Sequence, residues 1–151
     1  MKKHVILLSI AFAGMVMFSS CTEDPVEVII DSNLPNGDLS VSRAGSFIDQ
    51  NAAGSTGSAE LGTDEEGVQF LRFDDSFMTA LGTGTVTVYF STSMDYIADP
   101  ATGNPDLRLV GICQMNGENF YKLDPTVGSE FTHVILWCGS ANIPFGYAEL
   151  N

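Results

Sequence analysis

Histidine, cysteine and basic residues are scarce in this sequence. Among 151 residues there are two histidines, three cysteines and six lysines or arginines. A blue-copper centre requires two histidines and a cysteine. Only His133 lies beyond the N-terminal apolar segment, so this class of site is excluded. The pattern Cys-x-x-Cys is absent, which excludes a thioredoxin motif and covalently attached haem.

The shortage of basic residues also excludes one class of partner. The chain has 19 Asp or Glu residues and a formal net charge of −13. Two of the six basic residues, Lys2 and Lys3, lie at the N-terminus, and without residues 1–20 the net charge becomes −15. A surface this acidic repels phosphate backbones. We therefore expect no nucleic-acid partner.

The N-terminal apolar run is too short to span a bilayer. It extends from Val5 to Phe18, which is 14 residues, whereas a spanning helix needs about 20. Lysines before it and small residues after it are typical of a secretory signal. The following Phe-Ser-Ser-Cys resembles the lipobox of bacterial lipoproteins, with Phe18 where Leu is usual. The resemblance implies a lipoprotein signal peptide over residues 1–20 and acyl chains on Cys21, which would anchor the protein stably in a membrane.

Residues 21–40 read as a lipidated cysteine followed by an acidic tether. The tether contains Pro25, Pro35, Asn36 and Gly37 and one short apolar cluster, a composition typical of linkers. The acidic stretch "TEDPVE" is similar to signals that send some lipoproteins to the outer face of the outer membrane. We expect an extracytoplasmic, outer-membrane-anchored lipoprotein that is exposed at the cell surface. A solvated tether without a sorting role explains the same residues.

Residues 41–151 predict a single all-β domain. Short runs of aromatic and β-branched residues alternate with turns that contain Gly, Asn, Asp and Pro. No stretch sustains a helical period for ten residues, and only "DDSFMTAL" favours one turn of helix. We expect a small antiparallel β-sandwich or barrel of about eight strands. The eight candidate strands are 45–49, 57–62, 67–73, 85–93, 107–113, 119–123, 131–138 and 142–150.

Alternation along two of these strands predicts which side chains are buried. In "TVTVYFS", Val86, Val88 and Phe90 share one face, which is typical of a half-buried strand. In "FTHVILWC" both faces are largely apolar, which predicts a central strand covered on both sides. Cys138 ends this strand, beside Gly139. In "LRLVGIC", Cys113 shares a face with Leu107 and Leu109 and is expected to point inward.

Five segments together carry a family resemblance: "AGSFIDQNAAGSTGSAEL", "VQFLRFDDSF", "VTVYFS", "NGENFYKLD" and "HVILWCGSANIPFGYAEL". They resemble the DM-thirteen domain, a small β domain found beside DOMON domains and in bacterial secreted proteins. The resemblance covers about residues 44–150 and is most specific in "ILWC" and "FGYAEL". It implies extracytoplasmic electron transfer through a cysteine, and the matching position is Cys138. The chain departs from the family in "GTGTVT", where Gly-Pro-Asp-Leu is usual, and in having Cys113.

Cys113 and Cys138 leave three interpretations open. Two thiols in an oxidising compartment favour a disulfide. If the strands ending at Cys113, Leu123 and Cys138 form a meander, the two cysteines lie about 9–10 Å apart, beyond the roughly 7 Å limit for a disulfide. Both could instead be buried thiols that act as small apolar residues. The third interpretation is a reactive thiolate, although no Lys or Arg lies within ten residues of Cys138 and His133 projects to the opposite face of its strand.

The combined prediction is thiol-based redox or electron transfer at Cys138, with Cys113 as a second candidate. Trp137 is expected to shape the pocket and Gly139 to give access to it. A redox protein would be the partner, and the sequence does not identify a cofactor. The competing prediction is a non-catalytic cell-surface binding or adhesion module with structural cysteines. Redox chemistry requires a reactive Cys138, whereas binding would survive Cys138→Ser.

Overall fold

A computed structural model describes residues 33–96 and 103–151, which contain eight β-strands and no helix. The expected all-β fold and number of strands are confirmed. Within these residues no helix is long and apolar enough to cross a membrane. The predictions for residues 1–32, including Cys21, lie outside the described residues. The strands are β1 (Ser40–Asp49), β2 (Ser58–Thr63), β3 (Gln69–Phe73), β4 (Val86–Ser91), β5 (Leu107–Ile112), β6 (Asn119–Lys122), β7 (His133–Cys138) and β8 (Ile143–Glu149).

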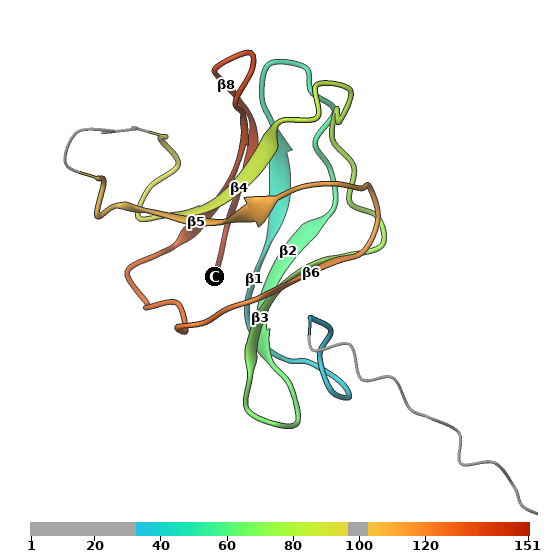
Figure 1. The fold of residues 1–151 in the computed structure, drawn as a ribbon, viewed down its shortest axis with the longest axis vertical. Coiled ribbons are helices and arrows are strands. Elements are labelled where there is room, and N and C mark those ends of the chain that lie inside the picture. Colours follow the sequence, from blue (N-terminus) through green and yellow to red (C-terminus); the bar gives the residue numbers. More distant parts are fainter. Residues whose placement is uncertain (1–32, 97–102) are drawn as a thin grey trace, which may run out of the picture. The chain divides into compact units, whose positions relative to one another are not determined.

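The strands form one antiparallel sheet in the order β5-β4-β7-β8-β1-β2-β3-β6. The sheet curls into a nearly closed barrel (Figure 1). The long strand β1 makes the corner, because its first residues pair with β2 and Phe47–Asp49 pair with β8. The edge strands β5 and β6 do not pair with each other. Side chains bridge this seam: Arg108 donates to carbonyl oxygens of Pro125 and Thr126, and the Tyr121 ring lies against Gly111.

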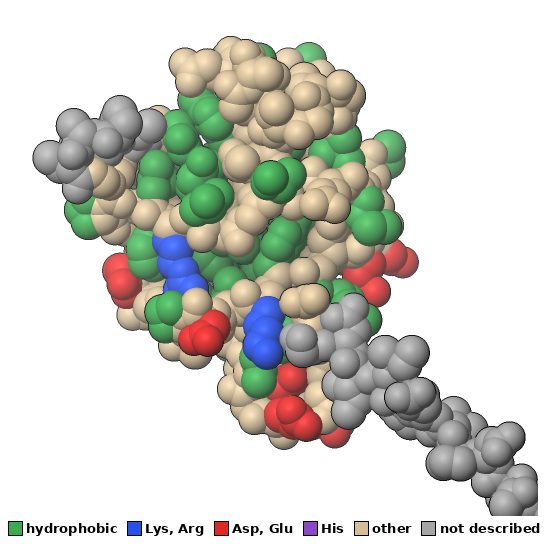
Figure 2. Space-filling view, viewed as in Figure 1, with side chains coloured by type: hydrophobic (Ala, Val, Ile, Leu, Met, Phe, Trp, Pro, Cys, Tyr) green, Lys and Arg blue, Asp and Glu red, His purple; other side chains and the backbone are tan. Residues whose placement is uncertain are grey.

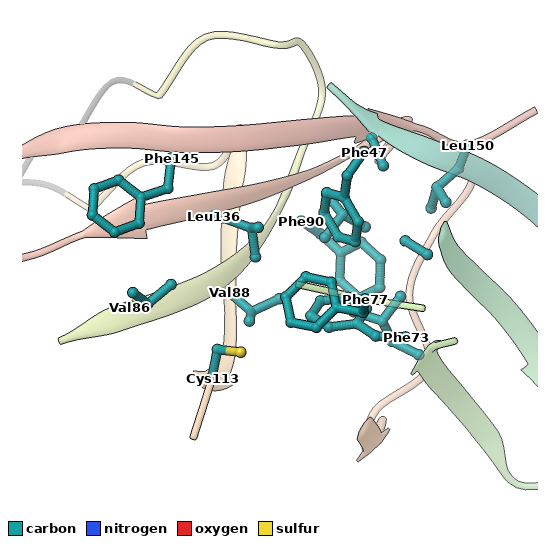
Figure 3. Packing of buried hydrophobic residues seen from close by; sticks show 14 of the residues in the cluster. Phe47, Phe73, Phe77, Val86, Val88, Phe90, Cys113, Leu136, Phe145 and Leu150 are labelled. Atoms are coloured by element: carbon teal, nitrogen blue, oxygen red, sulfur yellow. The ribbon is translucent and has the colours of Figure 1, made fainter. Parts of the chain in front are cut away.

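Aromatic side chains fill the middle of the barrel (Figure 3). Phe47 lies 5.0 Å from Phe73 and 5.2 Å from Phe77, between ring centroids, and Phe73 lies 4.6 Å from Phe77. These three rings come from β1, β3 and the connection after β3, so they tie together distant parts of the sequence. Inward positions of β4 complete this cluster, and the predicted inward face of that strand is confirmed: Val86, Val88 and Phe90 have no exposed surface.

Strand β7 occupies the central position that its apolar pattern predicts. It pairs with β4 on one side and β8 on the other. Val134, Leu136 and Cys138 point into the barrel core, and Ile135 is fully buried on the outer face. On that outer face Ile135 is flanked across the strands by Tyr89 and Tyr147. The strand is therefore covered on both sides.

The structure differs from expectation at β5. Strands β5, β6 and β7 do not form the meander that the sequence left open, because β4 is the neighbour of both β5 and β7. The register of β5 on β4 also shifts at Tyr89, where Leu109 and Gly111 occupy consecutive pairs and Val110 is the extra residue. This bulge changes the alternation. Cys113 is buried as expected, but Leu109 lies on the other face and is 60 % exposed.

Local hydrogen bonds explain two further differences from expectation. The segment "DDSFMTAL" makes no helical turn, because Asp74 accepts hydrogen bonds from Phe77 N–H and Ser76 N–H and closes a β-turn. The tether is expected to extend to residue 40, but part of it packs on the domain. Asn36 N–H donates to the Asp64 carboxylate, and the Asn36 carbonyl accepts from Glu65 N–H.

Candidate functional site

Cys138 lies at the last position of β7, directly under the surface of the barrel. Its side chain has no exposed area and points to the inner face beside Val86, its cross-strand partner in β4. Two exposed residues, Thr83 and Ser140, lie over the sulfur. The thiol is thus covered by a single layer of small polar side chains.

Three hydroxyl groups surround the Cys138 sulfur. Its Sγ atom lies 3.5 Å from Thr83 Oγ1, 3.5 Å from Ser140 Oγ and 3.7 Å from Thr85 Oγ1. These hydroxyls also bind one another. Thr85 donates to Ser140 Oγ at 2.9 Å, and the Ser140 N–H donates to Thr85 Oγ1 at 3.1 Å. The result is a small polar nest at the end of an otherwise apolar strand.

Two turns hold these hydroxyls in place. The turn before β4 is closed by a hydrogen bond from Gly84 N–H to the Leu81 carbonyl, and Gly84 has a φ of 65° that favours glycine. The turn after β7 is closed by a hydrogen bond from Asn142 N–H to the Cys138 carbonyl. The two turns are joined because Gly139 N–H donates to the Thr85 carbonyl at 2.9 Å. Pairing of β4 with β7 therefore brings residues 83–85 onto Cys138.

The surrounding donors make the Cys138 thiol unusually acidic. As a neutral thiol, Cys138 donates to Thr83 Oγ1. Burial disfavours the thiolate, but hydrogen bonding with Thr83, Ser140, the Ala141 N–H and Thr85 outweighs it and lowers the pKa of Cys138 to about 7. Thiolate reactivity depends on this ionisation. The absence of Lys and Arg near Cys138 in the sequence therefore does not prevent thiolate formation, because dipoles supply the stabilisation instead.

The role expected for Trp137 is wrong, and access through Gly139 stays a prediction. Trp137 projects to the outer face, where it stacks on Tyr96 with ring centroids 3.9 Å apart, so it does not line the Cys138 site. A side chain on Gly139 would make ordinary contact with Thr85, 3.5 Å from its carbonyl oxygen, and nothing there requires glycine. The side chains in contact with the sulfur are instead those of Thr83, Thr85 and Ser140.

Cys113 and Cys138 are both free thiols, which settles the disulfide left open by the sequence. Val86 lies between them: it pairs with Cys138, and its carbonyl accepts a hydrogen bond from Cys113 N–H. The two cysteines are thus separated by strand β4, which places them about 9–10 Å apart, too far for a disulfide. The intervening strand is β4 and not β6, which the meander would have required.

Cys113 has the opposite chemical character to Cys138. It lies in the core near the seam, where its thiol donates to the Met115 carbonyl and lies beside the Tyr121 hydroxyl. Burial raises the pKa of Cys113, and hydrogen bonding with Tyr121 and the Met115 backbone offsets only part of this increase. Burial also raises the pKa of Tyr121. Both groups are therefore neutral in the pH range where Cys138 ionises.

His133 takes no part in either thiol site. It lies on the outer face with its ring 6.0 Å from Tyr147, and its Nδ1 atom is 2.9 Å from the Thr132 hydroxyl. The expectation that it projects away from Cys138 is confirmed. Within residues 33–96 and 103–151, no three His, Cys, Asp or Glu side chains are grouped as a metal site would require.

The sequence analysis missed Thr83, Thr85 and Ser140. The segment "GTGT" reads as a turn, which is correct, but its hydroxyls reach a residue 55 positions away. These residues could have been found only from knowledge that strands 85–93 and 131–138 pair with each other. Once these strands are neighbours, a residue just before one lies next to a residue at the end of the other, because the pair is antiparallel.

Comparison with known proteins places the chain in a family. The model of the family described as "Electron transfer DM13" matches residues 46–150. The chain belongs to the DM13 electron-transfer family. The match covers all strands from within β1 to β8, and it includes Cys138 and the hydroxyl residues around it. No curated protein and no solved structure matches the chain.

Proposed function

We propose that this DM13 domain transfers electrons through Cys138, whose thiolate is the redox-active group. The observation that carries the proposal is the nest formed by Thr83, Thr85 and Ser140 around the sulfur. A buried cysteine that served only as a small apolar residue would not need three hydroxyl neighbours. The hydroxyls favour the charged thiolate, which is the form that gives up an electron.

The position of Cys113 favours one-electron chemistry. Two-electron oxidation of a thiolate to a disulfide needs a second thiol within reach, and strand β4 lies between Cys113 and Cys138. In the one-electron step, the Cys138 thiolate loses one electron to a partner's redox centre and becomes a thiyl radical, while the partner's centre is reduced by one electron. Return of an electron restores the thiolate. Cys113 is a structural thiol in this proposal.

The second part of the proposal concerns location. Lipidation at Cys21 would hold the domain at the outer membrane, outside the cytoplasm, with residues 22–32 as a tether. Few basic side chains occur on the face shown in Figure 2, in line with the excess of acidic residues in the chain. A redox partner would therefore contact the domain through a basic surface. Mass spectrometry of the protein from bacterial membranes tests the anchor, because unmodified Cys21 would contradict it.

Voltammetry of the full chain tests the redox group. We expect a one-electron wave that persists in Cys113→Ser and disappears in Cys138→Ser. Above pH 7 the potential should not change with pH, because the thiolate is the reduced form. Below pH 7 the potential should rise by about 59 mV for each unit by which the pH falls, since one proton then accompanies one electron in the reduction. A wave that survives Cys138→Ser would overturn the proposal.

One observation favours the alternative, a binding module without redox chemistry. Three large apolar side chains are exposed on and beside the edge strand β5, namely Leu109, Ile112 and Met115, and β5 pairs with a neighbour on one side only. Exposed apolar surface at a sheet edge is typical of contact sites. Cell-surface binding that persists in Cys138→Ser and is lost in Leu109→Asp would support the alternative.

A further inference from the structure

Three aromatic rings form a continuous contact on the outer face of the barrel, opposite the core. The rings of Tyr96 and Trp137 are stacked, with centroids 3.9 Å apart and planes inclined by 18°. The ring of Tyr89 meets Tyr96 edge to face at 5.1 Å. Tyr96 lies five residues after Ser91, the end of β4, so residues 92–96 bring its ring onto Trp137. All three rings remain partly exposed.

This aromatic stack is joined to Cys138 by a single peptide unit. Trp137 and Cys138 are consecutive in β7, and successive side chains of a strand project to opposite faces. The Trp137 carbonyl, which belongs to the connecting peptide, accepts a hydrogen bond from Thr87 Oγ1 at 3.1 Å. The dipeptide therefore crosses the sheet, with the thiol on its inner side and the indole on its outer side.

We propose that the Tyr96–Trp137 stack is the contact through which electrons pass between Cys138 and an external one-electron redox centre. The inference rests on the proposed function of Cys138. A redox centre cannot touch the sulfur directly, because the sulfur has no exposed surface. The partly exposed indole is the oxidisable group that is covalently nearest to it.

The electron balance is simple. An external acceptor takes one electron from the Trp137 indole and leaves a radical cation. The Cys138 thiolate then gives one electron to the indole, which returns to its neutral form while the thiolate becomes a thiyl radical. The acceptor is reduced by one electron overall, and no proton moves. Tyr96 stays protonated throughout, because burial and the neighbouring Tyr89 raise its pKa to about 12, and it acts as an extension of the indole surface.

Photochemical oxidation of the full chain tests this route. Laser excitation of tris(bipyridine)ruthenium(II), with hexaammineruthenium(III) as quencher, generates a cationic oxidant that an acidic protein attracts. At pH 8 a spin trap should label Cys138, as mapped by mass spectrometry. We expect Trp137→Phe to reduce the labelling at least tenfold, because phenylalanine is much harder to oxidise than tryptophan. Tyr96→Ala should reduce it by a smaller factor, because the indole that gives up the electron remains.

A matched control is available on the same face. Tyr147 is also partly exposed but lies beside His133 and is not in contact with the stack. Tyr147→Phe should leave the labelling of Cys138 unchanged. In Cys138→Ser the transient absorption of the indole radical should last longer than in the wild type, because its electron donor is missing.

The outcomes separate this inference from the proposed function. Wild-type labelling in Trp137→Phe would overturn the route and leave Cys138 as the redox group. Failure of the wild type itself to form a thiyl radical, although thiolate absorbance shows that Cys138 is ionised, would overturn both. Thiolate absorbance near 240 nm in each variant shows that the Cys138 site is intact, so a loss of labelling cannot be assigned to unfolding.

Discussion

The Oγ1 atom of Thr83 lies 3.5 Å from the sulfur of Cys138, although 55 residues separate them in the sequence. Thr83 is exposed and Cys138 is not. The hydroxyl thus combines two functions: it covers the sulfur and it stabilises the thiolate. The predictions that follow separate this contact from the stability of the fold.

Replacing Thr83 with Val should raise the pKa of Cys138. The substitution keeps the shape of the side chain and removes a hydrogen bond that favours the charged form. We expect the pKa to increase by about one pH unit, since hydrogen bonds to charged groups are stronger than those between neutral groups. Thiolate absorbance titrated in a Cys113→Ser background measures it. Thr56→Val, which removes an exposed hydroxyl that donates to the Ser76 carbonyl, should change nothing, and an equal effect there would refute the assignment.

The ionisation of Cys138 should make stability depend on pH. Its pKa is about 7 in the folded protein and about 8.5 in an unfolded chain. The stabilisation is therefore fully present above pH 8.5 and is lost as the pH falls through 7. Relative to Cys138→Ser, the free energy of unfolding should rise between pH 6 and pH 9 by on the order of 1 kcal/mol, because solvent near the thin cover weakens the interaction. Urea unfolding of both proteins at each pH provides the comparison, and parallel pH profiles would contradict it.

Phe77 should contribute more to stability than its place in an irregular segment suggests. Its ring is fully buried against Phe47 and Phe73. Phe77→Ala should lower the free energy of unfolding by about 3–5 kcal/mol, because it leaves a cavity among aromatic rings. The neighbouring Met78 is 56 % exposed, and Met78→Ala should change the value by about 0.5 kcal/mol or less. Urea midpoints at constant slope measure both, and similar losses would show that Phe77 is not a core residue.

Gly45 should tolerate no side chain. A Cβ atom at this position would overlap the carbonyl oxygen of Glu149, where β1 passes close to the end of β8. Gly45→Ala should cost about 1–3 kcal/mol, because backbone atoms must move to make room. At Gly82 no atom lies within 4 Å of the corresponding Cβ position, so Gly82→Ala serves as the control. Thermal melting compares them, and equal melting temperatures would show that the strands can separate without loss.

The strands were predictable because local pattern decides them. Each of the eight runs of aromatic and β-branched residues became a strand, and the burial of β4 and β7 follows from their alternation. The order of the strands was not predictable from these patterns. The long strand β1 joins the two halves of the sheet, because it pairs with β2 up to Ser46 and with β8 from Phe47. No local sequence signal marks this change of partner strand, since the same types of residue pair with either neighbour.

The candidate site was predictable in part. Its central residue, Cys138, follows from the family resemblance and from its place at the end of a buried strand. Thr83 and Thr85 were not identified, because their relation to Cys138 depends on which strands are neighbours and on their register. The same holds for Trp137, whose true neighbour, Tyr96, belongs to a segment that has no strand pattern. Contacts set by strand register or by irregular segments need the three-dimensional structure.

The extra residue in β5 has a consequence for the chemistry of the surface. Because Val110 interrupts the alternation, Cys113 faces the core while Leu109 faces solvent. In a strand without this interruption the two would lie on the same side. The sulfur would then be a surface thiol, open to cross-linking with another molecule and to stepwise oxidation. A single extra residue in an edge strand thus keeps the Cys113 thiol buried. The domain therefore does not expose Cys113 as a second reactive thiol beside Cys138, the one we propose it uses.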